Sequence, residues 1–190
     1  MLSEKLGHSL DKPLEVFARK IPFSPNTITV TGFVLTAASS IILAHNLMMG
    51  ALFLLPAGLL DMLDGIVARS RGESSTFGAF LDSVLDRYSD AAILLAVAWN
   101  LGSNGNITGV ILSLITLVGS LIISYARARA EGLGVSCNHG LMERPERLLI
   151  LFAGAVSGYM VPMLWLLAGL THLTVVQRIL FALKQFRKTV

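Results

Sequence analysis

Apolar residues dominate six long stretches of the chain, and short polar segments separate them. The stretches run approximately over residues 27–46, 49–69, 77–101, 106–130, 144–159 and 160–184. An α-helix needs about 20 apolar residues to cross the hydrocarbon core of a bilayer. The pattern therefore predicts an all-α, polytopic membrane protein with six transmembrane helices, of which the last two are separated only by a turn at residues 157–159.

Residues 1–22 follow a different pattern. Leu2, Leu6, Leu10, Leu14 and Phe17 recur every three or four positions between charged residues. This spacing is typical of an amphipathic helix, here a juxtamembrane segment lying on the membrane surface. A helix packed against the bundle would show the same pattern. The chain contains no internal repeat or low-complexity segment, so we expect residues 1–190 to form one membrane domain.

The composition and the distribution of charge agree with a membrane location. Hydrophobic residues make up 54% of the chain and charged residues 14%, against about 25% charged residues in a soluble domain. Lys and Arg occur before the first stretch, around the second connection, after the fourth stretch and near the C-terminus. The positive-inside rule then predicts a multi-pass protein of the cell membrane, with both termini and the charged end in the cytoplasm.

Four carboxylates interrupt the second and third apolar stretches. Asp61 and Asp64 are three residues apart, and Asp82 and Asp86 are four residues apart, so each pair lies on one face of its helix. Ionised groups at membrane depth are costly unless they are paired, bind a metal or line a wet cavity. If the two helices are antiparallel neighbours, the carboxylates converge on one point that a divalent cation would neutralise.

Other roles are open to these carboxylates. They could form structural salt bridges with arginines, relay protons, lie in the interfacial zone or bind a transported ion, and the last role would make the protein an ion or metal transporter. Polar groups at mid-membrane depth would then be expected in the last two stretches, which are almost wholly apolar. Asp90, one turn beyond Asp86, is interpreted as a structural partner for Arg87 or for a neighbouring helix.

The acidic segment resembles the signature of a known family. It is complete here as D-x-x-D-G-x-x-A-R-x(8)-G-x-x-x-D-x-x-x-D, from Asp61 to Asp86. The chain is similar in this motif, in its length, in its six apolar stretches and in residues 25–29 to the CDP-alcohol phosphatidyltransferases. The resemblance implies a membrane enzyme of phospholipid biosynthesis that transfers a phosphatidyl-type group from a CDP-linked lipid to an acceptor hydroxyl and releases CMP.

The resemblance also implies roles for individual residues and a cofactor. Mg²⁺ or Mn²⁺, with two ions the expected number, would be bound by the carboxylates and would stabilise the leaving CMP. Asp86 would be a further ligand or the general base that accepts the proton of the hydroxyl. The metal ligands would be Asp61, Asp64, Asp82 and Asp86. The residues contacting the CDP-lipid would be Asn26, Thr27, Gly65, Ala68, Arg69, Ser75 and Gly78.

A second polar region indicates the acceptor. Arg127, Arg129, Arg144 and Arg147 lie in the segments S-Y-A-R-A-R-A-E and E-R-P-E-R, around the loop between the fourth and fifth stretches. Arginine binds phosphate through a planar fork of donors, although arginines also occur at cytoplasmic helix ends for topological reasons. The two segments resemble those of phosphatidylinositol phosphate and archaetidylinositol phosphate synthases, which implies inositol phosphate as the acceptor and an arginine pocket for its phosphate.

Several alternatives are open at this level. Glycerol 3-phosphate would fit the same kind of pocket, which would make the protein a phosphatidylglycerophosphate synthase. The lipid could be CDP-diacylglycerol or CDP-archaeol, because tail contacts are generic apolar surface. Carboxylate ligands suit Mg²⁺ and Mn²⁺ alike. The family resemblance suggests a homodimer, and no nucleic-acid polymer is expected as a partner.

Overall fold

The computed structural model describes residues 21–137 and 140–189, which form six α-helices and no strand within those ranges. The helices are α2 (Pro25–His45), α3 (Leu47–Arg71), α4 (Thr76–Ser103), α5 (Ile107–Gly132), α6 (Arg144–Ser157) and α7 (Met160–Thr189). The all-α class is confirmed, and the helix bounds follow the apolar stretches of the sequence closely. The amphipathic helix predicted for residues 1–22 falls almost entirely outside the described residues, and residues 21–22 are irregular.

Short polar residues set the helix boundaries. Asn46 ends α2 and also caps α3, because its side-chain oxygen accepts a hydrogen bond from the amide of Met49 at 2.9 Å. Ser75 caps α4 in the same way through the amide of Gly78 at 3.0 Å. Gly72 ends α3 with a φ of 66°, a left-handed conformation that costs glycine little. The connection from α3 to α4 is therefore short and reverses the chain.

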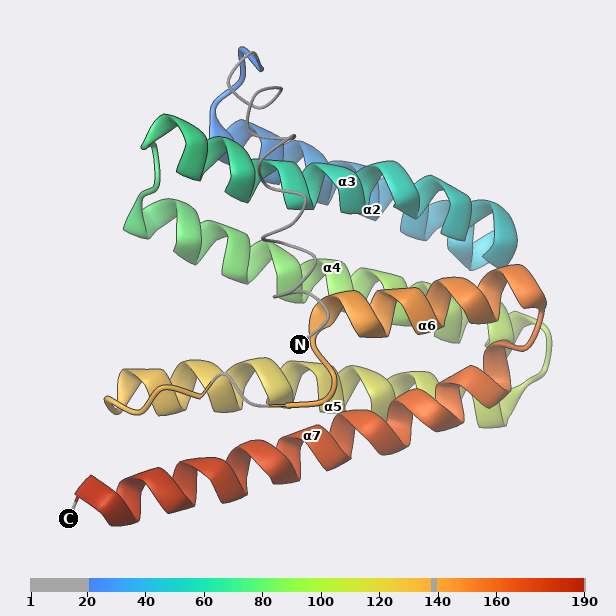
Figure 1. Cartoon of the computed structure of the whole chain (residues 1–190). Helices are drawn as coiled ribbons and strands as arrows, with labels where there is room; N and C mark the ends of the chain where they lie inside the picture. The colour runs from blue at the N-terminus through green and yellow to red at the C-terminus, as the bar shows by residue number, and fades with distance from the viewer. Residues whose placement is uncertain (1–20, 138–139, 190) are drawn as a thin grey trace.

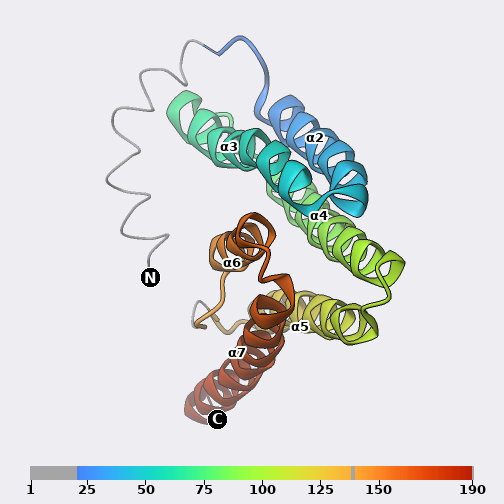
Figure 2. The ribbon, with the colours of Figure 1, turned by 90° about the vertical axis from the view of Figure 1, so that its right-hand side faces the viewer.

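The helices run up and down between two ends of the bundle. Figure 1 shows the α2–α3, α4–α5 and α6–α7 connections at one end, and the α3–α4 connection with the last turn of α5 at the other. The main packed pairs are α2 with α3 and α4, α4 with α5, α5 and α6 with α7, and α3 with α6, so the contacts close a ring that can be followed in Figure 2. The predicted separation of charged and uncharged connections is thus seen in the fold.

Small and apolar side chains fill the interior of the ring. Leu43, Val97, Leu164 and Leu167 are at most 2% exposed and belong to one cluster. Gly50 lies directly against the backbone of Leu43, so that no Cβ would fit there. Close approach at glycine is a common way for membrane helices to pack, because van der Waals contact replaces the hydrophobic driving force in lipid.

Four of the described helices are long and apolar enough to cross a membrane: α2, α3, α5 and residues 160–187 of α7. Helix α4 has sufficient length, but it carries the charged residues Asp82, Asp86, Arg87 and Asp90. Helix α6 has 14 residues, which is about 21 Å at 1.5 Å per residue and less than the roughly 30 Å hydrocarbon core. These four helices indicate that the chain is an integral membrane protein. The count of six spans stays a prediction.

Candidate functional site

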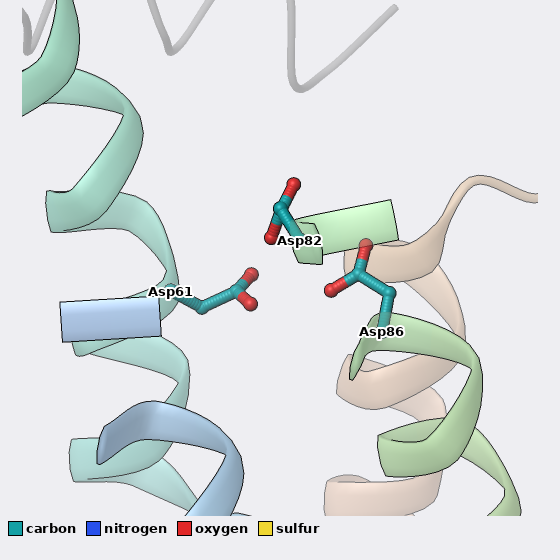
Figure 3. Close-up of side chains that lie close together, drawn as sticks. All are labelled: Asp61, Asp82 and Asp86. Atoms are coloured by element: carbon teal, nitrogen blue, oxygen red, sulfur yellow. The ribbon is translucent and has the colours of Figure 1, made fainter. Parts of the chain in front are cut away.

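Three of the predicted carboxylates converge between α3 and α4. Figure 3 shows Asp61 pointing from α3 toward Asp82 and Asp86 on α4. One oxygen from each lies within 4.8 Å of the others, and all three side chains are half-buried. The four-residue spacing on α4 places Asp82 and Asp86 on the same face, and the reversal at Gly72 brings that face opposite Asp61. We call these three residues the carboxylate cluster.

The fourth carboxylate of the signature has a different environment. Asp64 is buried, 7% exposed, and accepts a hydrogen bond of 2.7 Å from the Thr29 hydroxyl on α2. It is therefore not among the three carboxylates that approach one another. Its predicted role as a metal ligand stays a prediction, and its Thr29 partner could not be inferred from the signature.

The carboxylate cluster is a suitable donor set for a hard divalent cation. It offers six carboxylate oxygens, and Mg²⁺ and Mn²⁺ prefer oxygen ligands of this kind. Three carboxylates this close together repel one another when they are ionised, and a bound cation would relieve that repulsion. The residues present thus fit the metal that the signature implies.

One arginine contacts the cluster directly. Arg144, the first residue of α6, places Nη1 at 2.6 Å from carboxylate oxygens of both Asp61 and Asp86. Its Nε lies 3.7 Å from Asp90 and has no hydrogen-bond partner among the described residues. Because α6 begins part-way along the bundle (Figure 1), its first residue reaches the charged faces of α3 and α4. Salt bridges between these carboxylates and arginines were among the alternatives left open by the sequence, but Arg144 was predicted to bind the acceptor phosphate and was not singled out as the partner.

A cavity of about 210 Å³ opens beside the carboxylate cluster between α2, α3 and α4. Six of the seven residues predicted to contact the CDP-lipid line it: Asn26, Gly65, Ala68, Arg69, Ser75 and Gly78. Thr27, the seventh, is exposed and hydrogen-bonds with Ser24 at the start of α2. Asp64 and Asp82 also line this cavity, so it borders the cluster directly. We call it the nucleotide cavity.

Gly78 keeps one wall of the nucleotide cavity open. A Cβ at this position would lie 2.9 Å from Oδ1 of Asn26 and 3.0 Å from Oγ of Ser75. The Asn26 side chain would have to move, and a displacement of about 1 Å near reacting groups can reduce a rate by up to about a hundredfold.

Gly78→Ala is therefore expected to raise the KM for CDP-lipid by about tenfold to a hundredfold, as measured by CMP release at varied CDP-lipid in mixed micelles. Gly58→Ala is the matched control, because no atom lies within 4 Å of a Cβ built at this α3 glycine. An unchanged KM in Gly78→Ala would mean that the lipid nucleotide does not use this wall.

A second cavity, of about 370 Å³, is bordered by another member of the cluster, Asp86. Three of the four predicted arginines, Arg127, Arg144 and Arg147, line it together with Asp86 and Ser124. Arg129 does not line it and is exposed on α5. The remaining lining residues are Arg87, Asp90, Ile123, Glu143, Pro145 and Arg178. We call this space the arginine cavity.

Arg178 is a lining residue that the sequence analysis did not single out. It lies on α7, is only 4% exposed and donates a hydrogen bond of 2.6 Å to the carbonyl of Ile123. A signal was present, since Arg178 is an ionisable residue within an apolar stretch, and such residues are functional candidates in membrane proteins. It was grouped instead with the basic residues of the C-terminus.

Asp90 and Arg147 form a buried ion pair at the base of the arginine cavity. Nη2 of Arg147 lies 2.7 Å from Oδ2 of Asp90, and the two side chains are 5% and 8% exposed. Arg147 also donates to the carbonyl of Met142 at 3.4 Å. Of the two interpretations of Asp90, a partner on a neighbouring helix is therefore correct, while Arg87 contacts Asp86 at 3.6 Å.

The comparisons with known proteins agree on the class of protein. Residues 23–185 match the CDP-alcohol phosphatidyltransferase family. The chain is 37% identical over 181 residues to the archaetidylinositol phosphate synthase of Methanothermobacter thermautotrophicus, covering 92% of this chain and 90% of that protein.

Two solved structures are also similar. The phosphatidylinositol phosphate synthase of Mycobacterium tuberculosis with CDP-DAG bound superposes with a TM-score of 0.81 at 34% identity, covering 92% of this chain and 94% of the other. The same synthase in complex with manganese and citrate has the same TM-score and identity, with 91% and 88% covered.

The chain belongs to the CDP-alcohol phosphatidyltransferase family. It is accordingly a membrane transferase of phospholipid biosynthesis that depends on a divalent metal, and its carboxylate cluster provides ligands suited to that ion.

Proposed function

We propose that this protein transfers a phosphatidyl or archaetidyl group from a CDP-linked lipid to a hydroxyl of myo-inositol phosphate and releases CMP. One observation carries the proposal: the carboxylate cluster borders two cavities, because Asp82 lines the nucleotide cavity and Asp86 lines the arginine cavity. A transferase needs its two substrates on opposite sides of the reacting phosphorus, and this arrangement provides a separate space for each.

The CDP-lipid would occupy the nucleotide cavity. Asn26, Gly65 and Gly78 leave room there for the cytidine and diphosphate, and Arg69 offers a cation to the phosphates. The exposed apolar faces of α2 and α3 would accommodate the lipid tails, whether ester-linked or ether-linked. That the M. tuberculosis relative has been solved with CDP-DAG supports this substrate class for the present chain.

Asp61, Asp82 and Asp86 would hold the divalent metal, with Asp64 as the remaining predicted ligand. When bound, Mg²⁺ or Mn²⁺ supplies positive charge to the diphosphate and stabilises the leaving CMP. Asp61 and Asp64 are on α3 and Asp82 and Asp86 are on α4, so both helices would be needed to complete the donor set.

Asp86 is the best placed group to accept the proton of the acceptor hydroxyl, because it belongs to the cluster and also lines the arginine cavity. The hydroxyl oxygen would form a bond to the lipid-bearing phosphorus while the bond from that phosphorus to the bridging oxygen breaks. CMP would leave with the bridging oxygen and its electron pair. A positioned base of this kind typically contributes a factor of about 10²–10⁴ in rate.

The phosphate already present on the acceptor would bind in the arginine cavity. Arg127, Arg144, Arg147 and Arg178 line that space from the helices α5, α6 and α7, and their guanidinium forks match phosphate oxygens. A neutral acceptor such as free inositol would offer no anionic oxygens to these guanidinium groups. The naming of a similar relative as an archaetidylinositol phosphate synthase supports inositol phosphate in particular.

The remaining features of the proposal concern location and assembly. The basic residues at the α3–α4 end would face the cytoplasm, since positive residues are retained there, and the acceptor would enter from that side. The chain would act as one membrane domain and as a homodimer in the cell membrane.

The test is CMP release by the purified protein with Mg²⁺ and either CDP-diacylglycerol or CDP-archaeol. Inositol 1-phosphate, glycerol 3-phosphate, free inositol and L-serine are compared as acceptors. We expect release with inositol 1-phosphate to exceed that with free inositol and with L-serine by about tenfold or more, because one hydrogen-bonded charge contact to the phosphate provides about 1.5–3 kcal/mol. Glycerol 3-phosphate carries a phosphate too, so it is the acceptor that separates the two candidate reactions. Release with glycerol 3-phosphate alone would replace the proposed acceptor, and no release with any acceptor would remove the transferase assignment.

A further inference from the structure

We propose that Arg144 is an internal counter-cation of the carboxylate cluster, which the divalent metal must displace, and that the displaced guanidinium then completes the acceptor phosphate site. This inference rests on the proposed metal and acceptor sites. It assigns Arg144 a positioning role that couples the two.

The contacts of Arg144 are almost entirely to the residues that would bind metal. Its Nη1 lies 2.6 Å from Asp61 and 2.6 Å from Asp86, and the next nearest carboxylate is Asp90 at 3.7 Å. A metal coordinated by Asp61 and Asp86 would take the same carboxylate oxygens. The guanidinium and the metal are therefore competitors for one set of anions.

Arg147 provides a contrast on the same helix. Its carboxylate partner, Asp90, is not part of the cluster, and the pair is nearly inaccessible. Metal binding would leave that pair in place. The side chain of Arg144 is 18% exposed and its Nε is without a hydrogen bond among the described residues. Of the two arginines, Arg144 is the one whose partners would be lost and which has space to reorient.

The position of Arg144 indicates where it would move. It is the first residue of α6, and the N-terminus of a helix disfavours a cation unless an anion lies nearby. In the present conformation the carboxylates of Asp61 and Asp86 provide that negative charge. Arg144 also lines the arginine cavity, so rotation of its side chain would carry its charge toward an acceptor phosphate. The helix N-terminus and the guanidinium would then face the same anion.

This arrangement predicts a thermodynamic coupling between metal and phosphate. Metal binding frees Arg144 for the phosphate, and a bound phosphate holds Arg144 away from the carboxylates, so each ligand should strengthen the binding of the other. The arginine cavity would in consequence reach its full charge only when the cluster is occupied by the metal.

The first experiment measures Mn²⁺ binding to metal-free protein in micelles from the electron paramagnetic resonance signal of free Mn²⁺. Arg144→Gln removes the competing cation and is expected to tighten Mn²⁺ binding at least about fivefold, the lower end of usual coupling between sites. Arg144→Lys keeps the charge, so its affinity for Mn²⁺ should be closer to that of the wild type than the affinity of Arg144→Gln is. Lys184→Gln, at an exposed position on α7, removes the same net charge and should leave the Mn²⁺ affinity unchanged.

The second experiment repeats the Mn²⁺ titration in sodium sulfate and in sodium chloride of equal ionic strength, with sulfate as the phosphate-shaped probe. Sulfate is expected to tighten Mn²⁺ binding to the wild type and to have no such effect on Arg144→Gln. Thermal unfolding without metal gives an independent readout. Arg144→Gln leaves the carboxylates uncompensated, so it should unfold at a lower temperature than the wild type, and added Mn²⁺ should raise its unfolding temperature again.

The outcomes separate this inference from the proposed function. If Mn²⁺ binds to the wild type and binds Arg144→Gln equally tightly or more weakly, the counter-cation role is overturned while the metal site stays intact. An equal effect of sulfate on the wild type and on Arg144→Gln would overturn the coupling. Absence of Mn²⁺ binding to the folded wild-type protein would overturn the metal site itself, and with it this inference.

Discussion

Replacing Asp82 with asparagine is expected to reduce CMP release at least about a thousandfold, because loss of a group essential to metal-assisted catalysis removes several kcal/mol of transition-state stabilisation. Asp82 is the most informative carboxylate to change. It belongs to the cluster but forms no hydrogen bond or ion pair in residues 21–137 and 140–189, unlike Asp61 and Asp86 with Arg144. The substitution therefore removes a proposed metal ligand without breaking a contact that holds helices together.

The expected signature is loss of activity without loss of fold. The apparent unfolding temperature of metal-free Asp82→Asn should equal or exceed that of the wild type, because one of three mutually repelling carboxylates is gone. Mn²⁺ should bind more weakly and should stabilise the variant less. Activity within tenfold of the wild type at saturating metal would contradict a ligand role for Asp82.

Replacing Asp90 with asparagine is expected to have the opposite signature, a large loss of stability. Asp90 and Arg147 are buried together, and removal of one partner leaves a buried cation without compensation, which typically costs about 3–5 kcal/mol. For a chain of this size the unfolding midpoint should fall by roughly 6–20 °C, as measured by thermal unfolding in detergent. The pair joins α4 to α6, so the loss would also disturb the floor of the arginine cavity.

Two further variants test the cause of that loss. Arg127→Gln breaks an ion pair with Glu131 in which the side chains are 47% and 44% exposed, and such surface pairs contribute about 1 kcal/mol or less. The double change Asp90→Leu with Arg147→Met removes both charges and should recover much of the lost stability, since a buried pair can be replaced by apolar residues at little cost. An equally unstable double variant would show that shape, and not an unpaired charge, is responsible.

Much of the fold was predictable from local patterns. The helices α2 and α5 lie within two residues of the stretches 27–46 and 106–130, because apolar length and capping residues such as Asn46 act locally. The short helix α6 illustrates the limit of this approach. The apolar stretch 144–159 has near-spanning length and is followed directly by another apolar stretch. Gly158 and the turn before α7 nevertheless end the helix after 14 residues. Where such a helix lies depends on its packing against α3 and α7.

The candidate site was likewise predictable only in part. The signature spacing correctly placed Asp61, Asp82 and Asp86 together, since helical periodicity and one chain reversal suffice to bring them into contact range. Six of the seven residues predicted to contact the CDP-lipid also line the nucleotide cavity. The signature did not separate Asp64 from the others, because the Thr29 hydroxyl that binds this carboxylate belongs to a helix 35 residues earlier in the chain.

The membrane class, the number of helices in the described residues and the acidic motif can all be predicted from the chain without its fold, because each depends on spacing within one or two helices. The roles of the individual arginines depend on how the helices pack. Arg144 meets Asp61 across 83 residues, Arg147 is committed to Asp90, and Arg178 enters the cavity from the last helix. Ion pairs between distant helices depend on which faces pack together, and no local periodicity encodes that choice.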